Sequence, residues 1–267
     1  MKLSEIYKIA DEIAPKKLSD EYCLSCGAYD NSGILVDVGE EITGVLCTLD
    51  LTDGAIDKAI ALGANLILTH HPAIYGKIGE VRTDTPLGRK LIRCIRGGIS
   101  VLSMHLNLDC AQGGIDDSLM QGILLSSGAG TRSNAVEIFH KLSQGGYGRA
   151  YDVQEITLGA LADGVNKTFE TERTLVYGER ERKVKRVASF CGAGGDEECV
   201  DFAAAQGADV FLSSDIKHHV LIYAKEKGLA TIAITHAASE TYGFKKYYEK
   251  IRQAVGLPCY WHADDLL

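Results

Sequence analysis

The sequence predicts an α/β protein made of two related α/β domains, with mainly parallel or mixed sheets and a metal site between them. Short apolar runs alternate with helical segments along most of the chain, which is the pattern of β-α-β units. The order of these segments repeats after residue 184. Histidine and carboxylate residues follow the apolar runs in both halves. The alternation of segments, their repetition and these residues together lead to the prediction.

The composition limits the classes of protein that fit. The 267 residues, 46% of them hydrophobic and 24% charged, suffice for one large or two small domains. The net charge of −8 argues against a general affinity for nucleic acid or an anionic membrane. No segment approaches the ~20 apolar residues of a membrane span, and the first 14 residues show an amphipathic pattern instead of a signal peptide. Because the eight cysteines are scattered, we expect reduced thiols and a cytoplasmic protein.

The first half begins with an amphipathic helix and continues as alternating strands and helices. Thr52 is a suitable N-cap for a helix that runs to Leu62, and Gly63 is a suitable C-cap. An irregular connector occupies residues 73–85. The other expected elements are strands at 33–38, 44–49, 66–68 and 99–103 and helices at 87–96 and 115–126.

The second half repeats this order after a less regular stretch at 131–183. Within that stretch we expect a loop at 144–148 and a helix in 156–164. The repeat comprises strands at 184–190, 210–212 and 229–234, a tight strand-to-helix turn at 191–195, helices at 197–206 and 218–227, and a last helix to about 255. We therefore expect one domain at 1–130 and a second at 131–267, and the C-terminal helix can pack back on the first domain.

Two adjacent histidines end the predicted strand at 66–68. His70 and His71 precede Pro72, which cannot continue a sheet ladder. The carboxyl ends of strands are where open α/β sheets build their sites. Successive strand residues point to opposite faces, so we expect the two imidazoles to serve different purposes.

A histidine followed four residues later by an acid occurs after a strand in each half. The pairs are His105 with Asp109 and His236 with Glu240. This repetition suggests that strand ends from both halves converge with His70. The alternative is a set of unrelated polar loop residues.

The chemistry of this set favours two divalent metal ions. Imidazole and carboxylate suit zinc, manganese, iron, cobalt or nickel, and the lack of thiolate argues against a structural zinc site. The expected metal ligands are His70, His71, Asp109, His236 and Glu240, with Glu240 bridging the two ions. Such a pair activates water for hydrolysis.

Three further features near this set leave alternatives open. His105 is an orienting residue outside the ligand set, a proton shuttle or simply a buried partner of Asp109, and we do not expect it to be a ligand. Asp215 either holds a histidine in one tautomer or caps the helix that begins near His218. Cys23 and Cys26 form a C-x-x-C pair that we interpret as part of a loop, with a metal or redox role as the alternative.

Five separated motifs together resemble the Nif-three-like dinuclear-metal-centre proteins, also labelled GTP cyclohydrolase I type 2 homologues. Four of the motifs contain the histidine and carboxylate residues named above, and the fifth, Tyr29-Asp30-Asn31-Ser32-Gly33, resembles an N-terminal signature of that family. The resemblance spans nearly the whole chain. It implies two α/β domains, a dinuclear site between them, a toroidal homohexamer, and metal roles for the same five residues.

The resemblance also indicates where this chain differs. Thr235-His236-Ala237 stands where the family usually has Gly-His-Tyr, and His105-Leu106-Asn107 stands where it has His-Thr-Asn. The ligands are kept, whereas an aromatic ring and a hydroxyl that could contact substrate are missing.

The leading interpretation is a metal-dependent hydrolase that acts on a nucleotide or another heterocycle, similar to GTP cyclohydrolase. Glu240, His105 and Asp215 are the expected catalytic residues. The connector at 73–85 is expected to contact a small-molecule substrate through Tyr75, Lys77 and Arg82. The alternative is a non-catalytic, metal-stabilised oligomeric scaffold or regulatory binding protein.

Overall fold

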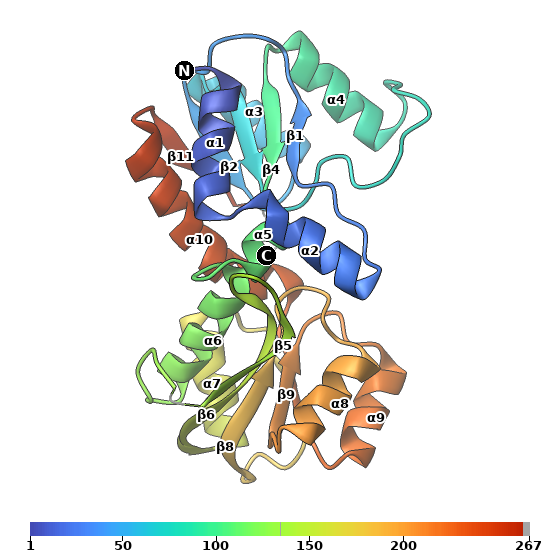
Figure 1. The fold of residues 1–267 in the computed structure, drawn as a ribbon, viewed down its shortest axis with the longest axis vertical. Coiled ribbons are helices and arrows are strands. Elements are labelled where there is room, and N and C mark those ends of the chain that lie inside the picture. Colours follow the sequence, from blue (N-terminus) through green and yellow to red (C-terminus); the bar gives the residue numbers. More distant parts are fainter. Residues whose placement is uncertain (134, 264–267) are drawn as a thin grey trace. The chain divides into compact units, whose positions relative to one another are not determined.

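The computed structural model describes residues 1–133 and 135–263, which form two compact units. The first unit contains Met1–Ala111 together with the described residues from Phe244 onward, and the second contains Gln112–Gly243. Each unit holds one sheet of parallel and antiparallel strands with helices packed on it (Figure 1), as the predicted fold class requires.

The sheet of the first unit has five strands in the order β1-β4-β3-β2-β11. The four strands from β4 to β11 are parallel, and β1 runs antiparallel at one edge. Their bounds are β1 (Gly33–Val36), β2 (Val45–Thr48), β3 (Leu66–Thr69), β4 (Ser100–Ser103) and β11 (Cys259–Trp261). The helices of this unit before Ala111 are α1 (Leu3–Ile13), α2 (Lys16–Cys26), α3 (Asp53–Leu62), α4 (Pro86–Arg96) and α5 (Leu106–Cys110).

The core of this sheet explains the apolar runs. All four residues of β2, β3 and β4 are buried, as is expected for parallel strands covered on both faces. Ile56 of α3 and Leu91 of α4 pack with Ile67 of β3 on one face. In Figure 1, α1 lies on the face opposite α3. Because both faces of β3 are packed, the position of the residue that follows this strand is well defined.

The end signals of α3 are confirmed. The Thr52 hydroxyl accepts a hydrogen bond from the Ala55 amide, and Gly63 adopts the left-handed conformation with φ of 67°. The glycine allows the chain to reverse directly into β3. Local sequence thus determines where the strand that leads to the histidines begins.

The sheet of the second unit has six strands in the order β5-β6-β8-β9-β10-β7. The central β8, β9 and β10 are parallel, and the outer pairings are antiparallel. Helices α6 and α7 lie on one side of this sheet, and α8 and α9 on the other (Figure 1). The strands are β5 (Val136–Lys141), β6 (Gly146–Thr157), β7 (Leu175–Tyr177), β8 (Lys183–Ser189), β9 (Val210–Ser213) and β10 (Ala230–Ala233). The helices are α6 (Ile115–Ser126), α7 (Leu158–Thr168), α8 (Glu197–Ala205) and α9 (His218–Glu226), and α10 (His236–Val255) begins here and continues into the first unit.

Several elements differ from the sequence-based expectation. Cys23 and Cys26 lie in helix α2 and not in a loop. The stretch expected to be irregular contains a long hairpin, because β5 and β6 pair from Val136 to Lys141. The two units meet in the sequence after Ala111 and not near residue 130, because α6 clusters with the second unit, whereas the described residues after Gly243 cluster with the first unit, as the sequence allowed for the C-terminal helix.

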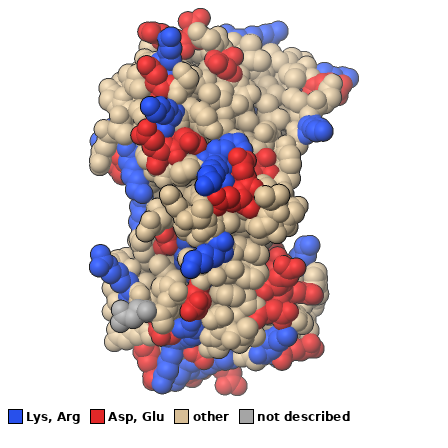
Figure 2. Space-filling model, viewed as in Figure 1, with Lys and Arg blue, Asp and Glu red and all other residues tan. Residues whose placement is uncertain are grey.

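The surface shows no single dominant charge on the face drawn in Figure 2, where acidic and basic side chains are intermingled. Among the residues that the structure describes, no helix is long and apolar enough to cross a bilayer.

Candidate metal centre

The centre of the first unit is His70, which follows β3 directly. Its side chain is fully buried, and its amide donates to the Thr48 carbonyl at 3.2 Å. Asp109 is 4% exposed and comes from α5, which follows β4. The His70 Nε2 and Asp109 Oδ1 atoms are 3.4 Å apart. Neighbouring parallel strands therefore deliver an imidazole and a carboxylate to one place, as the sequence indicated for these two residues.

His71 lies beside His70 and does not point away from it. The two ring centroids are 4.8 Å apart. The expected alternation fails because β3 ends at Thr69 and the strand geometry does not extend to His71. Both imidazoles thus lie at the same end of the strand.

Each of these two histidines is held through its Nδ1 atom. The Nδ1 of His70 donates to the Met104 carbonyl at 2.8 Å. The Nδ1 of His71 donates to Asp50 Oδ1 at 2.9 Å. Carbonyl and carboxylate oxygens only accept, so Nδ1 carries a proton and Nε2 is the ring nitrogen left for a ligand. This is the arrangement in which histidines bind metal ions in proteins.

His105 belongs to the same cluster, although the sequence interpretation did not count it as a ligand. One ligand atom from each of His70, His105 and Asp109 lies within 4.8 Å of the others, so this largely buried group could hold a metal ion. The rings of His70 and His105 are 5.3 Å apart. The first unit therefore contains a candidate metal-binding group of its own.

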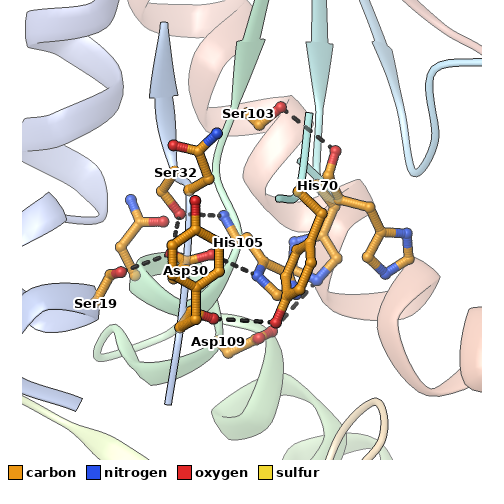
Figure 3. A network of polar contacts seen from close by, with 12 residues as sticks. Ser19, Asp30, Ser32, His70, Ser103, His105 and Asp109 are labelled. Atoms are coloured by element: carbon orange, nitrogen blue, oxygen red, sulfur yellow. Dashed lines mark hydrogen bonds and ion pairs between the residues drawn. The ribbon is translucent and has the colours of Figure 1, made fainter. Parts of the chain in front are cut away.

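Asp30 fixes His105, and the sequence interpretation assigned it no role. Figure 3 shows the Asp30 carboxylate at the centre of a polar network. It accepts from His105 Nδ1 at 2.7 Å and from the hydroxyls of Ser19 and Ser32, each at 2.6 Å. The position of Asp30 in the N-terminal motif was the only available signal, because nothing local links it to a histidine 75 residues away.

The Asp30 contact also sets the protonation of this pair. Burial lowers the pKa of His105, but the hydrogen bond to Asp30 and the charges of Asp109 and Asp30 outweigh it, so the pKa lies above its ordinary value. Burial raises the pKa of Asp30, but the His105 contact and the two serine hydroxyls hold it well below its usual range. The pair is therefore a carboxylate with an imidazole that readily takes a proton.

The second unit contains a similar arrangement at the start of α10. His236 Nδ1 donates to Asp215 Oδ2 at 2.6 Å, and His236 Nε2 is 2.9 Å from Glu240 Oε1. Glu240 is 2% exposed. Of the two alternatives for Asp215, the contact to a histidine is the one observed, since Lys217 is the N-cap of α9 and its side chain makes no cap bond.

The glycine turn after β8 makes room for Glu240. The strand-to-helix turn predicted at 191–195 is confirmed, because β8 ends at Ser189 and α8 begins at Glu197. Gly192 has φ of +56°, and a Cβ atom there would lie 2.5 Å from Glu240 Oε1. The Gly192 amide donates to Ser239 Oγ at 3.1 Å. The absence of a side chain at Gly192 therefore leaves room for the Glu240 carboxylate.

A buried ion pair holds the start of this turn. Asp116 of α6 is fully buried and accepts from the Cys191 amide at 3.0 Å and the Gly148 amide at 2.9 Å. It also pairs with Arg149, whose Nε contacts Asp117 Oδ1 at 2.7 Å. These contacts join α6, β6 and the end of β8 within the second unit.

The three predicted substrate residues have different surroundings. The Tyr75 hydroxyl donates to the Tyr29 carbonyl at 3.1 Å, and its ring lies edge-on to His105 with 6.3 Å between centroids. Lys77 is exposed. Arg82 is also exposed and pairs with Asp84 and Glu80. Of the three, Tyr75 is the one that lies beside a residue of the metal-binding group.

The donor set fits a divalent transition metal. The described ligand atoms are imidazole nitrogens and carboxylate oxygens, which suit zinc, manganese, iron, cobalt or nickel. The acceptor at the Nδ1 atom of His70, His71 and His236 leaves Nε2 as the ring nitrogen that would bind a metal ion. The residues present therefore fit a metal ion.

Comparison with known proteins gives consistent matches along the chain. Residues 1–261 match the family model described as Duf34/NIF3 (NGG1p interacting factor 3). A Clostridium perfringens protein named GTP cyclohydrolase 1 type 2 homolog is 32% identical over 255 residues, covering 95% of this chain and 92% of that protein. The NGG1-interacting factor 3 of Saccharomyces cerevisiae is 26% identical over 258 residues, covering 89% of this chain and 86% of that protein.

Solved structures give the same result for the fold. The reduced HcgD structure from Methanocaldococcus jannaschii matches with a TM-score of 0.80 and 26% identity, covering 98% of this chain and 97% of that one. A hypothetical protein of Staphylococcus aureus, SA1388, matches with a TM-score of 0.81 and 24% identity, covering 100% of this chain and 97% of that one. The match of the family model to nearly every residue, together with the fold and the histidine and carboxylate groups, shows that the chain belongs to the DUF34/NIF3 family.

Proposed function

We propose that this protein is a metal-dependent hydrolase that uses two divalent metal ions to activate water. The ligands in this proposal are His70, His71 and Asp109 of the first unit and His236 and Glu240 of the second. The observation that carries it is the set of Nδ1 contacts, because an acceptor at Nδ1 leaves Nε2 of each histidine as the nitrogen that would bind a metal ion, and in His236 this atom lies 2.9 Å from Glu240 Oε1.

The proposed division of work follows from the contacts of each residue. Bound divalent ions would lower the pKa of a coordinated water towards neutrality. Glu240, buried and in contact with His236 Nε2, supplies the bridging carboxylate. Asp215 orients His236, and Asp30 orients His105. His105, held through its Nδ1 atom by Asp30, is the residue to which we assign proton transfer.

A nucleotide such as GTP is the proposed substrate. Several relatives have the printed name GTP cyclohydrolase 1 type 2 homolog, and this name suggests the substrate class. Tyr75 stands beside His105 and offers an aromatic face for a heterocycle. Lys77 and Arg82 of the same connector would contact the phosphates, which requires Arg82 to leave Asp84.

The test compares turnover of GTP by the wild type and by Glu240→Gln in the presence of manganese or zinc. We expect the variant to lose at least about a hundredfold in kcat, because a carboxylate that binds the metal is replaced by a neutral amide. Metal content is measured on the same samples. Equal activity in the two proteins would remove the hydrolase proposal.

A second candidate function is a metal-stabilised oligomeric scaffold, and an apolar groove in the first unit favours an oligomer. The groove has a volume of about 580 Å³ and is lined by β1, α4 and the connector. Ile78, Val81 and Ile95 within it are between 41% and 56% exposed. We propose that copies of this chain cover it in a cytoplasmic homohexamer.

Chelation separates the two candidates. The molar mass is measured by light scattering before and after treatment with a chelator, together with turnover. Loss of the oligomer without any turnover before treatment would support the scaffold. Loss of turnover with an intact oligomer would support the enzyme.

A further inference from the structure

A hollow on the second unit is lined by none of the proposed metal ligands. It has a volume of about 610 Å³ and lies between helix α9 and the edge strand β7. This volume is within the range of about 300–1,000 Å³ that is usual for small-molecule sites. All of its lining residues belong to the second unit.

The hollow exists because α9 covers β10 but leaves β7 open, and because small residues form its floor. Ala230 of β10 is buried, and Gly178, with φ of +143°, approaches it so closely that a Cβ atom on Gly178 would lie 3.0 Å from the Ala230 Cβ. Thr231 is buried opposite Tyr177 in the β10–β7 pair. A larger side chain at these places would fill the space.

The walls are apolar and partly open to solvent. Tyr177 of β7 is 42% exposed, and Ile222 of α9 is 45% exposed. Leu221 of α9 and the buried Leu229 complete the apolar lining. Exposed apolar side chains that converge on a concave surface are typical of a site for an apolar group.

The residues at the rim of the hollow are mainly basic, whereas the chain as a whole is acidic. Arg182, His218 and Lys225 line the hollow and face one acid, Glu179, whereas the chain has a net charge of −8. In residues 1–133 and 135–263, neither Arg182 nor Lys225 forms an ion pair, while Arg180 and Arg186, close in sequence, both pair with aspartates. Basic side chains without an ion-pair partner at the mouth of an apolar hollow favour the binding of an anion.

We propose that this hollow binds a small organic anion that carries an apolar body. The body occupies the space between Tyr177 and Ile222, and the anionic group contacts Arg182 and Lys225. This site is independent of the proposed metal centre and of its chemistry.

The test uses two fluorescent probes with the same apolar body. The anionic probe is 8-anilinonaphthalene-1-sulfonate, and the neutral probe is N-phenyl-1-naphthylamine, which lacks the sulfonate. We expect one site per chain for each probe. The double variant Arg182→Ala/Lys225→Ala should bind the anionic probe about tenfold to a hundredfold more weakly, because two charge-assisted contacts are lost, and the neutral probe within about twofold of the wild type.

A matched control removes two cations outside the hollow. Lys183→Ala/Lys185→Ala changes the net charge by the same amount on β8, and it should leave both probes unaffected. Ile222→Ser should weaken both probes, because it removes part of the apolar wall. Equal weakening of the anionic probe by both double variants would overturn the proposal, since it would show a general electrostatic effect.

Two more outcomes would overturn it. One is unchanged binding of both probes to Ile222→Ser, which would place the probes elsewhere. The other is a change in molar mass by light scattering in the Ile222→Ser or Arg182→Ala/Lys225→Ala variants, which would show that a second copy of the chain covers the hollow.

Discussion

The histidines of the proposed ligand set owe their orientation to acceptors that are distant in sequence. His71 contacts Asp50 across 21 positions, and His70 contacts the carbonyl of Met104 across 34. Because an imidazole without such a partner can exchange tautomers and rotate, the acceptor is part of the binding site.

The first prediction concerns Asp50. Replacing it in Asp50→Ala removes the acceptor of His71 Nδ1, so we expect zinc affinity to fall about tenfold to a hundredfold. Asp37→Ala is the control, because the Asp37 carboxylate accepts the amide of Gly39 in its own turn. Zinc affinity is measured by competition with a chelating dye. Equal affinities in Asp50→Ala and the wild type would show that His71 is not a ligand.

The second prediction concerns Gly192. In Gly192→Ala the new Cβ would collide with the Glu240 carboxylate, so we expect weaker metal binding as well as lower stability. Gly207→Ala is the matched control, because Gly207 has φ of +67° and a Cβ there would meet no heavy atom within 4 Å among the described residues beyond its chain neighbours. Both variants should lose about 1–2 kcal/mol of stability from left-handed backbone strain. Metal affinity should fall in Gly192→Ala alone, and an equal fall in both would contradict the role given to this glycine.

The sequence was sufficient to name the candidate residues and to offer Asp215 as a partner for a histidine, but it did not indicate the partners of His70, His71 and His105. His70, Asp109, His236 and Glu240 could be listed because each follows a recognisable strand at a repeated spacing. The Asp30–His105 contact joins residues 75 apart, and no periodic pattern encodes such a pairing. The orientation of His71 depended on where β3 ends, which is the least predictable property of a strand.

At the scale of elements, the buried carboxylate of Asp116 connects one helix with two strands. It accepts two backbone amides and pairs with Arg149, which is 1% exposed. A buried charge of this kind is tolerated only when its partners remain in place.

The third prediction follows from this arrangement. Asp116→Ala removes one of the two carboxylates that pair with the buried Arg149 and leaves two amides without their acceptor, so we expect a loss of about 3–5 kcal/mol in unfolding free energy. Asp163→Ala breaks the exposed pair with Arg180 and should cost less than about 1 kcal/mol. Urea unfolding followed by circular dichroism measures both. Similar losses in the two variants would contradict the importance of burial.

Local signals predicted some elements well and missed others. The cap residues Thr52 and Gly63 marked α3 to within one residue, because capping is a local interaction. Helix α2 was missed because its apolar residues do not form a buried face: Leu18 and Ser19 are its only buried residues among those described, and Leu24 is 89% exposed. The β5–β6 hairpin was missed because its stability comes from pairing between strands and not from a strong apolar alternation.

At the scale of the whole molecule, the fourth prediction concerns the eight cysteines. Burial raises the pKa of Cys94 to about 11, and burial holds the pKa of Cys47 well above its ordinary value. A thiol with a raised pKa stays protonated at pH 8 and does not react as a nucleophile. We therefore expect the exposed Cys26 to react first with a disulfide reagent, and Cys47 and Cys94 to react only after unfolding.

Mass spectrometry of the labelled protein identifies the modified positions. All eight cysteines should react in denaturant. Labelling of Cys94 in the native protein at the rate of Cys26 would contradict the burial described for α4.

The pairing of β11 with β2 has a consequence for how the chain is made. Strand β2 lies in the first fifth of the sequence, yet its outer neighbour comes from residues 259–261. During translation, the whole segment of the second unit leaves the ribosome before that neighbour does, and it can fold as a nascent domain. Until residues 259–261 emerge, one edge of β2 has unpaired backbone N–H and C=O groups. A chain truncated near residue 255 would keep this edge open to pairing with another chain, which favours aggregation.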